Sequence, residues 1–138
     1  MERATPLLVP LVEEGWTDHP VTAEVIRIYL DQLVADARQT GLSPDTLVLG
    51  CTHYPLLRPL MERAVPEGMR VIDSAEAAAD AAVQLFNGRV SGARAAGAGQ
   101  GETEIRCFAT DSVEKFERMG SRFLGRPVGK VELVDLGG

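Results

Sequence analysis

The sequence is poor in cysteine and histidine, with only two of each in 138 residues. Its cysteines, Cys51 and Cys107, are too few for a disulfide scaffold, and an unbridged pair fits the reducing cytoplasm. Cys51 and His53 form a Cys-x-His pair, but no second pair of this kind follows to complete a zinc site. We therefore expect no bound metal ion and a cytoplasmic location.

The chain also lacks an excess of positive charge and a long apolar run. Its formal net charge of -6 argues against an electrostatic grip on nucleic acid or on an anionic membrane. No apolar run approaches the roughly 20 residues that cross a bilayer. The N-terminal stretch, broken by Pro6 and Pro10, does not fit a signal peptide. With 45% hydrophobic and 25% charged residues, the composition is that of a globular protein.

What the sequence does contain, over residues 1–88, is an alternation of helical and strand-like patterns. The expected elements are a helix over 20–41, a strand over 46–49, a helix over 56–64, a strand over 69–72, and a helix from an Asp73-Ser74 cap to about 87. Short, branched, apolar strands of this kind are typical of a parallel sheet that is buried on both faces. The order predicts an α/β fold with right-handed βαβ connections.

The long helix over 20–41 has the clearest pattern. Pro20 suits its first turn and Gly41 supplies its stop, while Thr17 or Asp18 can cap its start. The expected buried stripe is Val21, Val25, Ile28 or Tyr29, and Leu33.

The composition changes after residue 88. Residues 89–102 are rich in Gly and Ala without an apolar period, which predicts a flexible linker. Beyond it, a strand over 103–109, a helix capped by Ser112 and a strand over 130–136 form a β-α-β tail. A tail of about 35 residues is too small to hold a core by itself, so we expect it to dock on something else.

The stretch TLVLGCTHYPL, at residues 46–56, places a polar cluster directly after a buried strand. In open α/β sheets, ligands bind at the carboxyl ends of the strands. Cys51 lies there, ahead of a helix whose amides and dipole favour a thiolate or a substrate carboxylate. His53 is close enough in sequence to contact the same ligand or to exchange a proton with the thiol, and Thr52 adds a hydroxyl and a backbone amide. The pattern alone also allows Cys51 to be a small buried apolar residue and His53 a structural one.

The motif GCTHYPLL, at residues 50–57, resembles the signature around the second catalytic cysteine of the aspartate/glutamate racemase family. ATPLLVPLVEEG, at residues 4–15, is similar to a segment that glutamate racemases carry upstream, and residues 71–79 and 108–125 match the family in order and kind. The resemblance implies a three-layer, flavodoxin-like parallel sheet in a partial second domain over residues 1–88. It assigns the tail, residues 103–138, to an absent first domain on which it packs.

The resemblance implies cofactor-independent interconversion of L- and D-glutamate, which provides D-glutamate for peptidoglycan. Two cysteines face opposite sides of the substrate, and Cys51 takes the role of the one that removes the proton from L-glutamate. His53 assists Cys51, and Thr52 together with His53 contacts the substrate. Glu13 matches a family glutamate near the site, although a solvated loop acid is the other interpretation of this residue.

The resemblance also implies a deficit. The family's first half, with an Asp-Ser pair and a Cys-Asn-Thr motif, has no counterpart here, so we expect Met1 to open a truncated chain. Cys107 has no Asn-Thr after it and is interpreted as a packing residue. We therefore expect a chain that is inactive alone and that forms a homo-oligomer or associates with the N-terminal half. The alternatives are a non-catalytic amino-acid-binding or regulatory remnant, and a racemase of the aspartate or hydantoin type.

Overall fold

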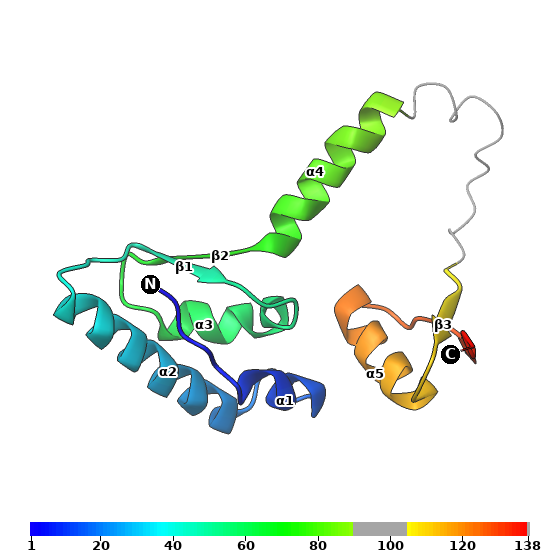
Figure 1. Ribbon diagram of the computed structural model, residues 1–138, viewed down its shortest axis with the longest axis horizontal. Helices are drawn as coiled ribbons and strands as arrows, with labels where there is room; N and C mark the ends of the chain where they lie inside the picture. Colours follow the sequence, from blue (N-terminus) through cyan, green and yellow to red (C-terminus); the bar gives the residue numbers. More distant parts are fainter. Residues whose placement is uncertain (90–104, 138) are drawn as a thin grey trace. The chain divides into compact units, whose positions relative to one another are not determined.

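Residues 1–89 and 105–137 are described by a computed structural model (Figure 1). They fall into two compact units that divide at residue 90. Each unit has its own small sheet, β1 with β2 in the first and β3 with β4 in the second. Both pairs are parallel. The predicted α/β fold with parallel strands is thereby confirmed.

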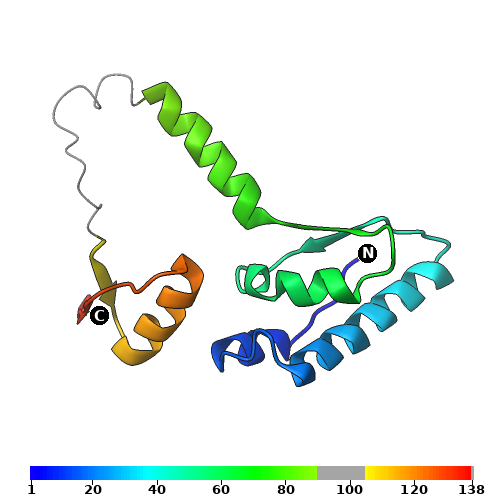
Figure 2. The same cartoon turned by 180° about the vertical axis from the view of Figure 1, so that it is seen from behind.

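The first unit contains one parallel strand pair and four α-helices. The bounds are α1 Leu8–Glu13, α2 Pro20–Gln39, β1 Thr46–Leu49, the 3₁₀ helix η1 Tyr54–Leu57, α3 Arg58–Ala64, β2 Arg70–Asp73 and α4 Ser74–Arg89. Helices α2 and α3 lie on the same side of the strands in both views (Figures 1 and 2). The strand bounds agree with the predicted ones to within a residue.

The core of the first unit lies between the sheet and the helices. Because side chains alternate along a strand, the two faces of the sheet can differ in burial. Leu49 and Val71 face the core, whereas Val48 and Ile72 are 65% and 45% exposed. The prediction of strands buried on both faces is therefore wrong for the described residues, which supply helices for one face only.

Helix α2 confirms the predicted long helix, but its cap and its buried stripe differ. The cap is His19, whose Nδ1 accepts a hydrogen bond from the Val21 amide, rather than Thr17 or Asp18. The buried residues are Thr22, Ile26, Leu30 and Ala37. Thr22 donates its hydroxyl hydrogen to the Trp16 carbonyl at 2.7 Å, so a polar residue occupies a core position and turns Val21 outward. The spacing of apolar residues in the sequence cannot reveal that Thr22 is buried.

Helix α1 occupies residues 8–13, where the sequence predicts no helix, in a stretch that follows Pro6 and contains Pro10. Pro10 lies in the first turn of this helix, where the missing N–H group would have had no partner within the helix. Leu8 and Val12 are almost completely buried and hold α1 on the unit.

The second unit is the predicted β-α-β tail, with bounds β3 Cys107–Ala109, α5 Val113–Leu124 and β4 Val131–Leu133. Ser112 caps α5 as predicted, because its Oγ accepts a hydrogen bond from the Lys115 amide at 3.3 Å. Both strands are shorter than predicted, although part of the first predicted strand lies outside the described residues. The core is small and comprises Ala109, Val128 and Val131, with Cys107 and Val113 packed against it. The predicted linker, residues 89–102, lies outside the described residues except for Arg89, which ends α4.

Candidate functional site

Cys51 lies directly beyond the carboxyl end of β1, separated from the strand by Gly50. The Tyr54 amide donates to the Cys51 carbonyl at 3.1 Å, which closes a turn over residues 51–54. The next helix, η1, begins only at Tyr54. Cys51 therefore precedes a helix, as expected, and the helical segment begins two residues earlier than the predicted helix over 56–64. Glycine, cysteine and threonine form a turn before Pro55 sets the first helical angle.

The turn brings a histidine ring to the cysteine. Cys51 Sγ and His53 Nδ1 are 3.9 Å apart, within hydrogen-bonding range for sulfur, with the donor set by the histidine tautomer. Both side chains are half-buried, while Thr52 between them is exposed. The residues that sequence reasoning expected to exchange a proton are thus in contact.

The other ring nitrogen of His53 faces a carboxylate. His53 Nε2 lies 3.6 Å from Glu13 Oε1, and the two side chains are 26% and 33% exposed. Glu13 is the last residue of α1, so this helix, which was not predicted from the sequence, positions the carboxylate. A thiol, an imidazole and a carboxylate in successive contact can hold and move a proton, since the carboxylate orients the ring.

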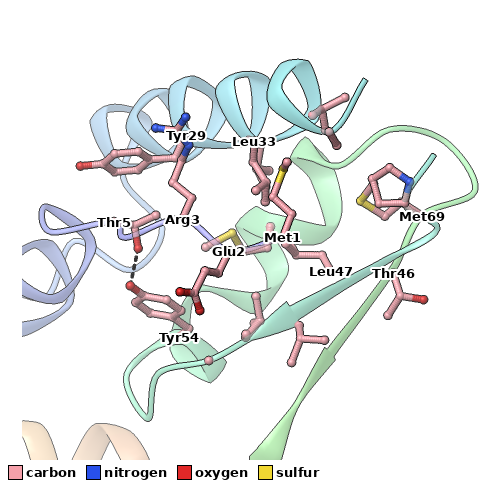
Figure 3. A pocket seen from close by; sticks show the side chains of 18 of the residues that line it. Met1, Glu2, Arg3, Thr5, Tyr29, Leu33, Thr46, Leu47, Tyr54 and Met69 are labelled. Atoms are coloured by element: carbon pink, nitrogen blue, oxygen red, sulfur yellow. Dashed lines mark hydrogen bonds between the residues drawn. The ribbon is translucent and has the colours of Figure 1, made fainter. Parts of the chain in front are cut away.

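A second contact joins the same two segments. The hydroxyls of Thr5 and Tyr54 form a hydrogen bond between the chain ahead of α1 and the first residue of η1 (Figure 3). The Thr5 carbonyl also accepts from the Leu8 amide at 3.1 Å, which starts α1. Helix α1 is therefore attached to the cysteine turn at both ends. Sequence reasoning missed Thr5 and Tyr54, since no pattern in the sequence pairs them.

A pocket with a cavity volume of about 1030 Å³ opens beside the site. Its walls are residues 1–5, one side of α2, and the whole of β1 (Figure 3). Cys51 and Tyr54 reach this pocket, whereas Glu13, Thr52 and His53 do not line it. The Cys51 thiol thus contacts the polar side chain of His53 on one side and borders a largely apolar pocket on the other.

The described residues lack two further features. No three side chains of the His, Cys, Asp or Glu type gather there as a bound metal ion would require. Within the same residues, no helix combines the length and the apolar character needed to span a membrane.

Comparisons by sequence give consistent relatives, although no family model matches the chain. A glutamate racemase of Koribacter versatilis is 50% identical over 154 residues, which cover 99% of this chain and 52% of the relative. A glutamate racemase of Syntrophus aciditrophicus is 42% identical, over 97% of this chain and 46% of the relative. The chain spans about half the length of the curated relatives that it matches.

Comparisons by structure agree. Glutamate racemase from Thermus thermophilus, solved in complex with β-chloro-D-alanine, is 34% identical with a TM-score of 0.71, over 96% of this chain and 46% of that one. Glutamate racemase from Francisella tularensis, solved in complex with D-glutamate, is 25% identical with a TM-score of 0.65, over 94% of this chain and 45% of that one.

A parallel α/β fold with a cysteine and a histidine at the end of its first strand, together with these relatives, defines the class as amino-acid racemases, which are isomerases. Within that class the chain belongs to the glutamate racemase family, whose C-terminal half it matches over nearly all of its length.

Proposed function

We propose that this chain provides one of the two proton-transfer faces of a glutamate racemase, with Cys51 as the acid–base group. The proposal rests on two contacts of the His53 ring. Its Nδ1 lies 3.9 Å from Cys51 Sγ, and its Nε2 lies 3.6 Å from Glu13 Oε1. Proton transfer at carbon needs a base, a neighbouring group that activates the base, and a third group that orients this neighbour.

The α-proton of an amino acid is very weakly acidic, so its removal needs a thiolate and a site that stabilises the carbanion. The Cys51 thiolate takes the α-proton of L-glutamate, which leaves a carbanion and a neutral thiol. A second acid on the opposite face then protonates the carbanion and yields D-glutamate. In the reverse direction, the second group removes the proton and the Cys51 thiol donates its own.

The residues near Cys51 assist this proton transfer from the positions that they occupy in the structure. His53 accepts the thiol proton to form the thiolate before the α-proton is removed, and Glu13 orients the imidazole ring. Thr52, exposed in the turn, and His53 are the proposed contacts of the substrate. No cofactor takes part in this scheme.

The second acid–base group is proposed to lie outside the first unit. Cys51 is the cysteine of residues 1–89, and Cys107 packs against the small core of the second unit. The chain alone is therefore expected to be inactive. Joined to the other half of the polypeptide, it would make D-glutamate for peptidoglycan in the cytoplasm.

The test uses a chimera in which the part of the Koribacter versatilis racemase that this chain does not match precedes Met1. We expect the chimera to racemise glutamate in both directions, by circular dichroism, and the isolated chain to do neither. Cys51→Ala should abolish both directions in the chimera, with Cys107→Ala as the matched control that retains activity. Robust turnover by the isolated chain would show that no second half is needed.

A non-catalytic amino-acid-binding remnant predicts a different pair of results. It would bind L- or D-glutamate in calorimetry yet fail to exchange the α-proton for deuterium in D₂O, even as the chimera. Exchange that is lost with Cys51→Ala supports the racemase, and binding without exchange supports the remnant. The same chimera tested with aspartate separates the two substrate classes.

A further inference from the structure

Helix α1 is too short to fix its own position. It has six residues, which makes it about 9 Å long, and no side chain caps its N-terminus. Isolated helices of this length are not stable in water, so its place in the molecule depends on the contacts that it makes. Its last residue, Glu13, lies 3.6 Å from His53 Nε2. The contacts of α1 therefore set the distance between this carboxylate and the ring.

These contacts are of two kinds. Leu8 and Val12 are almost completely buried, which attaches α1 to the unit. The hydrophobic effect is non-directional, so burial fixes the rotation of a short helix less strictly than a hydrogen bond does. The directional contact is the hydrogen bond between the hydroxyls of Thr5, just ahead of α1, and Tyr54 (Figure 3).

Tyr54 connects the segment that carries the thiol to the helix that carries the carboxylate. Its amide donates to the Cys51 carbonyl at 3.1 Å and closes the turn of the cysteine. Its hydroxyl bonds to Thr5, whose carbonyl accepts from the Leu8 amide at 3.1 Å and so begins α1. The same residue thus participates in both elements whose relative position decides the geometry around His53.

We propose that Tyr54, through its hydrogen bond with Thr5, is a positioning residue for the proton transfer at Cys51. The bond keeps α1 in the orientation that places Glu13 against His53. The separation of 3.6 Å already exceeds that of a direct hydrogen bond, which leaves little room for a shift of the helix. A misplacement of about 1 Å at a catalytic group can cost up to about 100-fold in rate. This role rests on the proposed function, and Tyr54 itself transfers no proton.

A contribution to stability alone is the competing explanation of the hydroxyl pair. It would reduce the fraction of folded enzyme, and this loss would multiply with the effect of any other substitution. A positioning role acts through Glu13, so its effect should disappear once Glu13 has been replaced. The two explanations therefore differ in a double-mutant cycle.

The first test measures racemisation by the chimera at a temperature at which circular dichroism shows every variant to be folded. Tyr54→Phe and Thr5→Val should each lower kcat about tenfold and leave KM for glutamate almost unchanged, and the double variant should lose no more than either. Thr5→Ser keeps the hydroxyl and should keep the activity. Tyr29→Phe is the matched control, since it removes a hydroxyl from another half-buried tyrosine beside the same pocket. Unchanged kcat in Tyr54→Phe and Thr5→Val would overturn the proposal.

The second test adds Glu13→Gln to the cycle. Tyr54→Phe introduced into the Glu13→Gln chimera should cause almost no further loss of kcat. Losses that multiply would assign the hydroxyl pair to stability and overturn the proposal. Cys51→Ala separates the two levels of the argument. Racemisation that survives it would overturn the proposed function, whereas a Cys51-dependent chimera that tolerates Tyr54→Phe would overturn the positioning role alone.

The third test requires no activity and uses the isolated chain. The chain has only two histidines, His19 and His53, so their ring signals are easily assigned in NMR spectra. At constant pH, Thr5→Val should shift the ring ¹⁵N signals of His53 in the same direction as Glu13→Gln does, and Thr5→Ser should not. The His19 signals serve as the internal control and should stay in place. His53 signals that Thr5→Val leaves unmoved, although Glu13→Gln shifts them, would overturn the proposal.

Discussion

His53 Nε2 lies 3.6 Å from Glu13 Oε1, while His53 Nδ1 lies 3.9 Å from Cys51 Sγ. One imidazole ring therefore links a carboxylate at the end of α1 to a thiol at the end of β1. Two elements that are distant in the sequence meet at this ring. From this position, Glu13 would act on the thiol through His53.

The first prediction concerns the carboxylate. Glu13→Gln in the chimera should lower kcat by at least about tenfold and leave KM for glutamate almost unchanged, because removal of an orienting carboxylate can cost up to about 10⁴-fold in a triad. The measurement is steady-state racemisation in both directions. Glu14→Gln is the matched control, since Glu14 is the exposed neighbour of Glu13. Equal losses for the two variants would remove Glu13 from the positioning role.

The second prediction concerns the hydroxyl pair that attaches α1 to η1. Tyr54→Phe removes the hydrogen bond with Thr5 and should lower the free energy of unfolding by about 1 kcal/mol, the usual net contribution of such a bond. Urea denaturation measures the change. Tyr29→Phe serves as the control, because it removes a hydroxyl from another half-buried tyrosine that lines the same pocket. A loss at Tyr29 as large as that at Tyr54 would contradict a specific role of the pair.

The third prediction concerns pH. A hydrogen bond from Arg27, at 2.9 Å, lowers the pKa of Glu24 below its usual 4.5. A carboxyl whose pKa is lower in the folded state stabilises the fold above its unfolded pKa, and this stability is lost as the pH falls through the folded pKa. Glu24→Gln should therefore be slightly less stable than the parent chain at pH 7, and the difference should shrink as the pH falls through the folded pKa of Glu24. Glu67→Gln, in the exposed turn ahead of β2, is the control.

Much of this fold was predictable because its signals are local. The bounds of β1 follow from a short branched run, and the stop at Gly41 follows from its left-handed backbone, with a φ of 75°. Helix α1 was missed because its proline lies in a first turn that tolerates it. The buried stripe of α2 was displaced because Thr22 forms its hydrogen bond with Trp16, a tertiary contact that periodicity cannot detect.

The candidate site likewise contains one contact that was predictable from the sequence and others that were not. The contact between Cys51 and His53 was predictable because two residues of one turn are necessarily close. The contact between Glu13 and His53 was not predictable from spacing, since it depends on how α1 packs on the turn, and only the resemblance singled out Glu13. The pocket along β1 had no sequence signal, because its walls come from several segments that are separate in the sequence.

The last prediction concerns Asp73, which ends β2 and caps α4. Its Oδ1 accepts hydrogen bonds from the Ala75 and Glu76 amides at 2.9 and 3.3 Å, and its Oδ2 accepts one from Arg58 Nη1 at 3.2 Å. Asp73→Ala should lower the free energy of unfolding by about 2 kcal/mol, the upper end for a lost N-cap, because the side chain is only 4% exposed and also pairs with the guanidinium. Asp73→Asn keeps a capping oxygen and should lose less.

Urea denaturation at pH 7 suits the comparison of the Asp73 variants, because Arg58, which pairs with Asp73, remains charged at this pH. Hydrogen bonds with Glu62 and then Glu76 raise the pKa of Arg58 above its already high usual value. A cation whose pKa is raised by folding contributes its full stability below its unfolded pKa and loses it only as the pH rises above that value. Asp80→Ala, on an exposed turn of α4, should change the stability by less than about 0.5 kcal/mol. If Asp73→Ala costs no more than Asp80→Ala, the junction between β2 and α4 is not held by this carboxylate.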